Sequence, residues 1–292
     1  MPWIQTHLTV DKTQVPLIEQ LFETLGALAI TLDDAADEPM LEPGPGETPL
    51  WQATRVSGLF PGGIDTDALR SALNQALGVD AGQNLKLEHL RDRDWERAWL
   101  DQFHPMCFGR RLWIRPTGHR IAQREAVVVD LDPGLAFGTG THPTTALCLG
   151  WLDGHDVQGL RIVDFGCGSG VLGIAALKLG AAQVIAVDHD PQALMASRDN
   201  AMRNGVSERI RVLNSTELAG QTADLVLANI LANVLVALAP RILDLLRPGG
   251  RLVMSGVLQP QADAVIRAYA DAIDFAPIET QQEWVLLHGR RR

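Results

Sequence analysis

Residues 161–190, RIVDFGCGSGVLGIAALKLGAAQVIAVDHD, constrain the fold more than any other stretch of the chain. An apolar run with strand character ends at Phe165, and a glycine-rich turn follows at 166–170. The residues after the turn carry apolar side chains at helical spacing and stop at Gly180, a residue type common at helix ends. A second apolar strand then ends at Asp188. Strand, glycine turn, helix, strand and acid together predict a nucleotide-binding β-α-β unit.

Each part of this unit has a physical use in holding a nucleotide. The glycines, of which Gly166 is the first, let the backbone approach a ligand without a clash at Cβ. The helix that follows the turn presents unpaired N–H groups to an anionic group. Asp188 can accept hydrogen bonds from both hydroxyls of a ribose. A charged Asp164 at the end of an apolar strand is costly without partners, which argues against a turn that only serves packing.

Two ligand patterns fit these glycines. Gly168, Gly170 and Gly173 match the dinucleotide fingerprint G-x-G-x-x-G, with Asp188 twenty residues beyond Gly168. Asp164 and the glycines that follow it match instead the acid-x-Gly-x-Gly-x-Gly pattern of class I methyltransferases that use S-adenosyl-L-methionine (SAM). Because an acid closes the strand and a glycine follows at once, the register favours SAM. An NAD-dependent oxidoreductase is the alternative.

The elements expected after this unit favour the same choice. Further strands are expected at 210–213, 224–228 and 251–255, helices at 191–204, 231–246 and 260–272, a sharp turn at 248–250, and a closing antiparallel pair at 275–280 and 283–288. A dinucleotide dehydrogenase would more often continue in parallel. The predicted fold class is therefore α/β, a class I methyltransferase Rossmann-like sheet with an antiparallel last strand.

Residues 1–91 predict a separate small domain without a catalytic constellation, used for recognition or packing. Strands and helices are expected in the order β-α-β-β-α-β, at 3–10, 13–25, 27–32, 51–60, 65–77 and 85–90. That order is typical of a ferredoxin-like α+β domain. Residues 92–125 are expected to form a linking region, with Trp95 and Trp99 on one face of a helix and a strand at 112–115. The SAM-dependent methyltransferase domain is expected at 126–292.

Charge and composition exclude several partners. The net charge of −10 and the pI of about 5.2 argue against direct nucleic-acid binding and favour a basic protein partner. The basic clusters at 110–115 and 290–292 are interpreted as solvated charge. The longest apolar region, 223–239, is interrupted by polar residues, so no membrane association is expected.

The cysteines and the N-terminus indicate a compartment. The three cysteines are far apart in sequence, which gives no disulfide, zinc or other metal signal and fits a reducing environment. The N-terminal residues lack the pattern of a signal peptide. A cytoplasmic location is therefore expected.

Two further stretches add candidate site residues. The loop 132–145, DPGLAFGTGTHPTT, combines glycines and threonines ahead of a helix, and we expect it to close over the ligand. Thr144 and Thr145 have the alternative role of capping that helix, and His142 is interpreted as structural. Asn229 follows a predicted strand and should lie at the ligand edge of the sheet, or cap the next helix.

On these motifs the chain resembles the bacterial methyltransferases of large-subunit ribosomal protein eleven. The resemblance is carried by DPGLAFGTGTHPTT at 132–145, VDFGCGSGVLGIAA at 163–176, AVDHDPQA at 186–193, ANIL at 228–231 and LRPGG at 246–250. The glycine and PGG motifs are common to class I methyltransferases. The FGTGTHPTT loop together with ANIL is specific to the family, and the similarity spans nearly the whole chain.

The resemblance implies a SAM-dependent enzyme that methylates amino groups, mainly lysine ε-amines, of that ribosomal protein, with the N-terminal domain holding the substrate. Carried across by motif, Thr145, Gly166, Asp188 and Asn229 would contact SAM, and Phe137 would belong to the loop over its methionine end. Methyltransferases of glutamine or adenine usually carry Asn/Asp-Pro-Pro-aromatic where this chain has Asn229-Ile-Leu-Ala, which argues against those targets. No general base is identified.

Overall fold

The computed structural model describes residues 3–36, 50–78, 80–90, 104–132, 142–218 and 220–292. The chain divides into two compact units, Met1–Ala98 and Trp99–Arg292, each with its own buried apolar cluster. The predicted linking helix and Phe137 lie outside the described residues. The assignment of recognition, linking and catalysis to 1–91, 92–125 and 126–292 stays a prediction.

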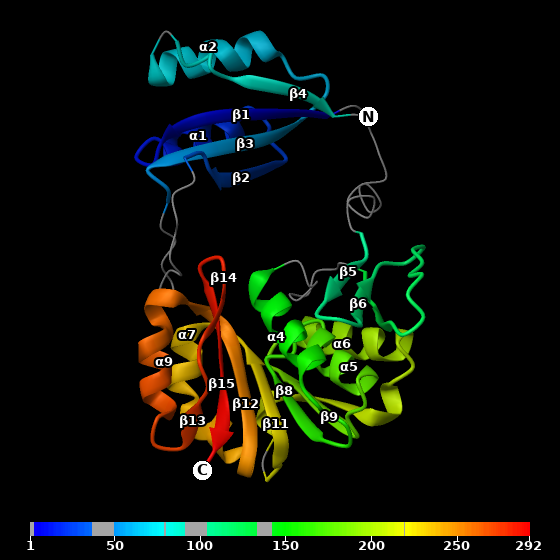
Figure 1. Ribbon diagram of the computed structural model, residues 1–292. Helices are drawn as coiled ribbons and strands as arrows, with labels where there is room; N and C mark the ends of the chain where they lie inside the picture. The colour runs from blue at the N-terminus through cyan, green and yellow to red at the C-terminus, as the bar shows by residue number, and fades with distance from the viewer. Residues whose placement is uncertain (1–2, 37–49, 79, 91–103, 133–141, 219) are drawn as a thin grey trace. The chain divides into compact units, whose positions relative to one another are not determined.

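The first unit is a four-stranded antiparallel sheet with two helices (Figure 1). Its elements are β1 (Trp3–Asp11), α1 (Val15–Thr24), β2 (Ala29–Asp34), β3 (Ala53–Pro61), α2 (Thr66–Leu77) and β4 (Lys86–Leu90), and the sheet order is β2-β3-β1-β4. Alternate residues of β1 point inward, and Phe22 of α1 packs edge-on against Phe60 of β3 with ring centroids 5.5 Å apart. Asp65 caps α2 by accepting from the N–H groups of Asp67 and Ala68. The two helices therefore pack against one face of the sheet.

The second unit contains a mostly parallel eight-stranded sheet. Its elements are α4 (Pro143–Gly154), β8 (Arg161–Phe165), α5 (Val171–Lys178), β9 (Gln183–Asp188), α6 (Pro191–Arg203), β10 (Ile210–Asn214), β11 (Ala223–Asn229), α7 (Ala232–Ala237), α8 (Ala239–Asp244), β12 (Leu246–Leu258), α9 (Ala262–Tyr269), β13 (Ile273–Phe275), β14 (Glu279–Gln281) and β15 (Trp284–Arg291). The strand order is β10-β9-β8-β11-β12-β15-β13, with β14 also paired to β15. The strands from β10 to β12 are parallel and β15 is antiparallel to β12, which confirms the predicted reversed strand.

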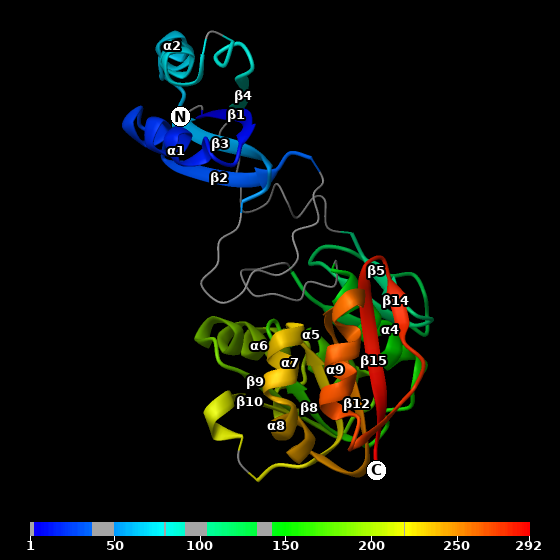
Figure 2. The same ribbon diagram turned by 90° about the vertical axis from the view of Figure 1, so that its left-hand side faces the viewer.

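Helices cover both faces of this sheet, which explains why its central strands are apolar throughout. In Figures 1 and 2, α4, α5 and α6 lie on one face and α7, α8 and α9 on the other. Neighbouring residues of β8 point to opposite cores: Ile162 joins the cluster under α4 and α5, and Val163 joins the cluster under α7 to α9. Rigid packing on both faces fixes the strand ends that carry the site.

Two local predictions are wrong. The single helix expected at 231–246 is two helices, α7 and α8, which meet at Leu238 because Pro240 lacks an N–H and fits only the first turn of a helix. The turn expected at 248–250 lies within β12, which runs from Leu246 to Leu258 with an irregular register near its start.

A small sheet precedes the main one in the second unit. It consists of β5 (Met106–Phe108), β6 (Leu112–Arg115) and β7 (Val127–Asp130), with β5 antiparallel and β7 parallel to β6. The sequence pattern predicts strands at 112–115 and 126–131, which are β6 and β7, but it predicts neither β5 nor the pairing. Leu112, Ile114 and Val129 join the cluster that also packs α4 and α5, so this sheet is part of the same core.

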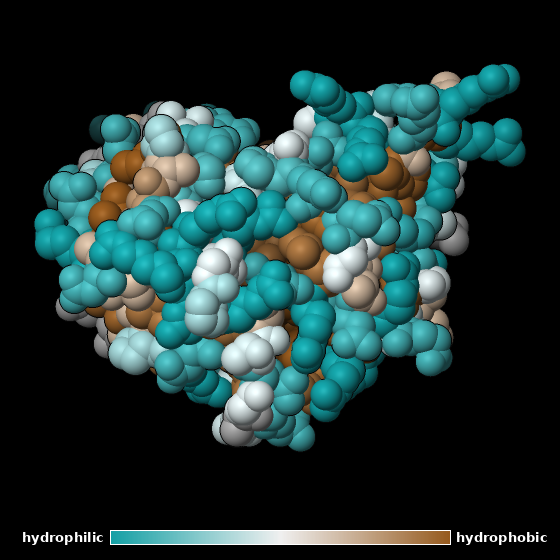
Figure 3. Space-filling model, turned by 60° about the horizontal axis from the view of Figure 1, so that its bottom comes forward, coloured by the Kyte–Doolittle hydropathy of each residue, from teal (hydrophilic) through white to brown (hydrophobic). Residues whose placement is uncertain are grey.

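The surface seen in Figure 3 is mostly hydrophilic, with hydrophobic residues showing in smaller areas between. No helix among the described residues has the length and apolar character needed to cross a membrane. Arg115 pairs with Asp130 at 2.6 Å, Arg292 pairs with Asp274 at 2.7 Å, and Arg291 donates to backbone carbonyls. The two basic clusters are therefore partly tied to neighbours, which differs from the expectation of solvated charge.

Candidate active site

The predicted site residues meet at one edge of the parallel sheet. The carboxyl ends of β8, β9 and β11 bring the glycine turn, Asp188 and Asn229 together, because β8 pairs with both of its neighbours in register. The N–H of Gly166 donates to the carbonyl of Val187 at 2.8 Å and ties the turn to β9. Ligands of parallel α/β sheets bind at this edge.

Asp188 holds the glycine turn through its carboxylate. Oδ2 accepts from the N–H of Gly168 at 3.0 Å. Oδ1 accepts from the backbone N–H groups of His189 and Asp190 at 2.8 and 3.0 Å and lies 3.3 Å from Nδ1 of His189, so the free acceptor position is on Oδ2. A carboxylate has about four lone-pair positions, so about one remains for a ligand hydroxyl. The sequence predicts that Asp188 accepts from two ribose hydroxyls. The second hydroxyl would therefore have to share a lone pair of the carboxylate with a backbone N–H.

Asp164 lies beneath the turn and is almost inaccessible, with 1% of its surface exposed. Its Oδ2 accepts from the N–H of Gly173 at 2.9 Å, whereas Oδ1 is buried without a hydrogen-bond partner. Burial raises the pKa of Asp164 to about 7; the Gly173 N–H opposes this rise and the nearby Asp188 charge adds to it. The site thus holds a buried carboxyl group, that of Asp164. A nearby positive charge would favour its ionised form.

We expect Asp164→Asn to change how stability depends on pH. The folded-state pKa of about 7 exceeds the ordinary value of 3.8, so the folded chain binds more protons than the unfolded chain between these values. The free energy of unfolding therefore falls as pH rises through that window, and asparagine removes this contribution. Urea unfolding of the ligand-free proteins from about pH 5 to about pH 8 should show a smaller decline for the variant. An equal decline in both proteins would refute the assignment.

Asn229 and Thr145 form a contact between segments 84 residues apart. Nδ2 of Asn229 donates to Oγ1 of Thr145 at 3.2 Å, and Oδ1 of Asn229 is buried without a partner. The helix-capping alternative for Asn229 is wrong, because the residue that precedes α7 as its cap is Leu231. Burying an acceptor without a hydrogen-bond donor costs about 1–3 kcal/mol. A bound ligand that donates to Oδ1 of Asn229 would remove this cost.

The start of α4 is capped by His142, so the alternative in which Thr144 or Thr145 caps it is also wrong. Nδ1 of His142 lies 2.7 Å from Oγ1 of Thr144, and its ring meets Trp284 edge-on with centroids 4.8 Å apart. His142 therefore has the structural role expected from the sequence. Capping by His142 leaves the Thr145 hydroxyl in contact with Asn229.

Two glycines leave space for Ile230, the residue that follows Asn229. Gly166 has φ +77°, and a Cβ there would lie 2.2 Å from Cγ2 of Ile230. Gly256 has φ +80°, and a Cβ there would lie 2.3 Å from the carbonyl oxygen of Ile230. Sequence reasoning assigned Gly166 to ligand approach and missed Gly256, although an isolated glycine inside a strand pattern is a known signal of close backbone approach.

Sequence reasoning also missed two residues of α6. Ser197 donates to the carbonyl of Gly168 at 2.9 Å, and Asn200 donates to the carbonyl of Ser169 at 2.8 Å. The available signal was the i, i+3 spacing of polar residues on a helix that must pack against the sheet. These side chains support the turn from behind.

The residues at this edge fit SAM. The two unpaired buried oxygens, on Asp164 and Asn229, suit a ligand that carries positive charge and N–H donors. Asp188 offers an acceptor for a hydroxyl, and the glycine turn opens the end of β8. Together with the strand order and the reversed β15, they define a class I SAM-dependent methyltransferase, and nothing here supports the alternative of an NAD-dependent oxidoreductase.

Comparison with known proteins identifies the family. The family model described as ribosomal protein L11 methyltransferase (PrmA) matches residues 2–292, and the chain belongs to this family. Relatives named ribosomal protein L11 methyltransferase include one from Vibrio cholerae, 50% identical over 293 residues, and one from Pectobacterium atrosepticum, 52% identical over 295 residues; each match covers 100% of this chain and 99% of the relative. The crystal structure of ribosomal protein L11 methylase from Lactobacillus delbrueckii subsp. bulgaricus is 32% identical, with a TM-score of 0.61, over 65% of this chain and 100% of that one. The resemblance stated from the motifs is confirmed.

Proposed function

We propose that this chain transfers methyl groups from SAM to amino groups, mainly lysine ε-amines, of ribosomal protein L11. The names of its relatives supply the substrate. The observation that carries the chemistry is the buried, unpaired Oδ1 of Asn229 at the ligand edge, which is an acceptor for an amine N–H. The free cysteines suit a reducing compartment, so we place the reaction in the cytoplasm.

The site's task is alignment. When bound, SAM supplies a methyl group already activated by the sulfonium charge. The chain must place a neutral amine in line with it, and orientation of this kind accounts for much of the rate of such reactions. A lysine must first lose a proton, and a pocket with little water lowers the pKa of an amine. Asn229 then accepts one N–H through Oδ1 and leaves the nitrogen lone pair free to react.

The other candidate site residues hold the cofactor and Asn229. We assign Asp188 to a ribose hydroxyl through its remaining acceptor position, and Gly166 to contact with SAM through its backbone. Thr145 accepts from Nδ2 of Asn229 at 3.2 Å, so it fixes which atom of the amide points into the site. In this arrangement Thr145 and Asn229 border both SAM and the amine.

The proposal is tested by incubating purified ribosomal protein L11 with this chain and SAM, followed by mass spectrometry. We expect methyl additions on lysine residues that require both SAM and the chain. An unrelated basic ribosomal protein serves as the control and should stay unmodified. Unmodified L11, under conditions in which calorimetry shows that the chain binds SAM, would refute the assigned substrate.

We expect Thr145→Ala and Asn229→Ala to lower turnover while the chain stays folded. Loss of the Thr145 acceptor removes one hydrogen bond and should cost about 10-fold. Loss of Asn229 removes the group that aligns the amine and should cost about 100-fold. Asn233→Ala is a matched control, because this exposed asparagine of α7 bonds only to the next backbone N–H among its described contacts. Circular dichroism checks the fold, and unchanged turnover in both variants would show that the site map is wrong.

A further inference from the structure

The glycine turn after β8 has a backbone that its own side chains do not restrain. Gly166, Gly168 and Gly170 have φ of +77°, +52° and +78°. Glycine takes positive and negative φ about equally readily, so the unbound turn has alternatives to this conformation. Ordering a loose segment when a ligand binds lowers affinity. The contacts that hold the turn before SAM arrives therefore matter for SAM affinity.

Gly168 is held on both of its peptide groups. Its N–H donates to Oδ2 of Asp188 at 3.0 Å, and its carbonyl accepts from the Ser197 hydroxyl at 2.9 Å. Oδ2 is also the Asp188 atom that keeps a free acceptor position. A continuous line of described hydrogen bonds thus runs from Ser197 of α6 through Gly168 to the acceptor proposed for a ribose hydroxyl.

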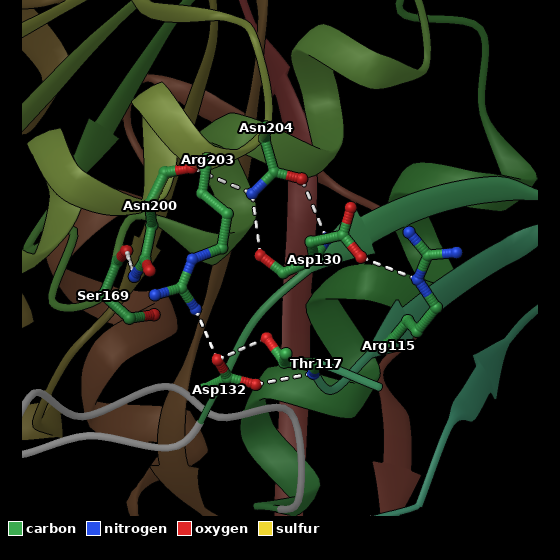
Figure 4. Close-up of polar contacts among 8 residues, drawn as sticks. All are labelled: Arg115, Thr117, Asp130, Asp132, Ser169, Asn200, Arg203 and Asn204. Atoms are coloured by element: carbon green, nitrogen blue, oxygen red, sulfur yellow. Dashed lines mark hydrogen bonds and ion pairs between the residues drawn. The ribbon is translucent and has the colours of Figure 1, made fainter. Parts of the chain in front are cut away.

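Asn200 holds the next peptide group of the turn. Its Nδ2 donates to the carbonyl of Ser169 at 2.8 Å (Figure 4). Ser197 and Asn200 lie three residues apart, which places them on one face of α6, and they are 0% and 9% exposed. Because a peptide group is planar, each fixed carbonyl also fixes the direction of the N–H that follows it. The two side chains therefore set two successive peptide planes of the turn.

Close packing brings Ser197 within reach of the turn. A Cβ at Gly170 would lie 2.9 Å from Oγ of Ser197 and 3.2 Å from its Cβ. The same hydroxyl lies 3.3 Å from Sγ of Cys167. Position 197 thus requires a small side chain, and the hydroxyl adds the donor that the Gly168 carbonyl uses.

We infer that Ser197 and Asn200 are positioning residues for SAM, which preset the glycine turn and, through Gly168, the Asp188 carboxylate. This inference rests on the proposed location of the SAM site. Neither side chain belongs to the group that aligns the amine. Their loss should therefore weaken SAM binding and raise KM for SAM, while kcat at saturating SAM changes little.

The test compares Ser197→Ala, Asn200→Ala and Asn204→Ala in the full-length chain. Asn204 is a matched control, because it is a third polar residue of α6 and is 5% exposed. Its side-chain amide donates to the carbonyl of Asp130 and accepts from its N–H, both at 2.8 Å, as a neighbouring strand would (Figure 4). None of its described contacts reaches the glycine turn. The measurements are the SAM dissociation constant by calorimetry, KM for SAM, kcat and the unfolding midpoint of the ligand-free chain.

We expect the SAM dissociation constant and KM to rise about 5-fold in Ser197→Ala and about 10-fold in Asn200→Ala, the scale of one lost hydrogen bond, with kcat within about twofold. Asn204→Ala should lower the unfolding midpoint as much as Asn200→Ala does, because each removes a buried amide, and it should bind SAM like the parent. Ser197→Ala deletes a single oxygen atom, so it tests the inference even if Asn200→Ala fails to fold.

Parent-like SAM affinity in Ser197→Ala and in folded Asn200→Ala would overturn the inference. An equal loss of affinity in Asn204→Ala would overturn it too, because the effect would then follow from lower stability. Asp188→Ala is the reference for the site itself. Weak SAM binding in Asp188→Ala, with normal binding in the Ser197 and Asn200 variants, refutes the positioning role alone, whereas normal binding in all of them shows that SAM binds elsewhere.

Discussion

A chain shortened to begin between Arg91 and Trp99 is expected to bind SAM with nearly the affinity of the full chain and to lose methylation of ribosomal protein L11. The glycine turn, Asp188, Asn229 and Thr145 all belong to the second compact unit, Trp99–Arg292. The first unit has its own apolar cluster and offers no described catalytic group. Lysines on a protein surface look alike at short range, so selection of one substrate requires a second surface, and the first unit is the sizeable part without another task.

Two measurements separate the possible results of this truncation. Calorimetry with SAM reports the cofactor site, and mass spectrometry of L11 reports methyl transfer. Circular dichroism and a cooperative unfolding transition serve as controls that the shortened chain is folded. Full methylation by the shortened chain would remove the first unit from substrate recognition. Loss of SAM binding in a folded shortened chain would show instead that the first unit helps to build the cofactor site.

Asp188→Ala should weaken SAM binding by about 2–3 kcal/mol, the scale of hydrogen bonds to a charged group, or about 30- to 150-fold. Two effects add. The variant loses the acceptor for a ribose hydroxyl, and it frees the N–H groups of Gly168 and His189 that the carboxylate now holds. The glycine turn then loses part of its preset position before SAM arrives.

The measurement is isothermal calorimetry with SAM on the parent and the variant. Asp199→Ala is the matched control, because it removes an exposed carboxylate from the same part of the chain and should leave affinity unchanged. Asp188→Asn separates the two effects, since an amide keeps one acceptor oxygen but not the charge, and we expect an intermediate affinity. Parent-like affinity in Asp188→Ala would exclude Asp188 from the site.

The sequence sufficed where local pattern decides structure. The strands at 112–115 and 161–165 have the predicted bounds, because each is a short apolar run next to a charged or glycine residue. The class of the sheet followed from the alternation of strands and helices and from the closing antiparallel pair. The glycines after β8 and the acid at the end of β9 placed Gly166 and Asp188 at one edge, since parallel strands align their carboxyl ends.

The sequence failed where distant segments decide structure. Asn229 had capping of the next helix as its alternative role, and the folded chain excludes it because α7 begins after Leu231, whereas Asn229 contacts Thr145. The small sheet of β5, β6 and β7 depends on pairing that no local pattern indicates. Asn204 is a residue type that is common at helix ends, so the sequence does not single it out. Its bonds to Asp130 arise only in the folded chain. The break at Leu238 is different, because Pro240 is a local signal that the sequence reasoning overlooked.

The bonds of Asn204 to Asp130 also bear on self-association. β7 is the outer strand of its sheet, and unpaired outer strands are templates for aggregation. Val127 and Leu131 donate to Arg111 and Arg115 on the β6 side, so the peptide groups of Val128 and Asp130 face outward. Asn204 occupies both outward groups of Asp130, so a foreign strand cannot pair with this residue. A side chain that mimics a peptide group thereby shields this edge from pairing with a second molecule.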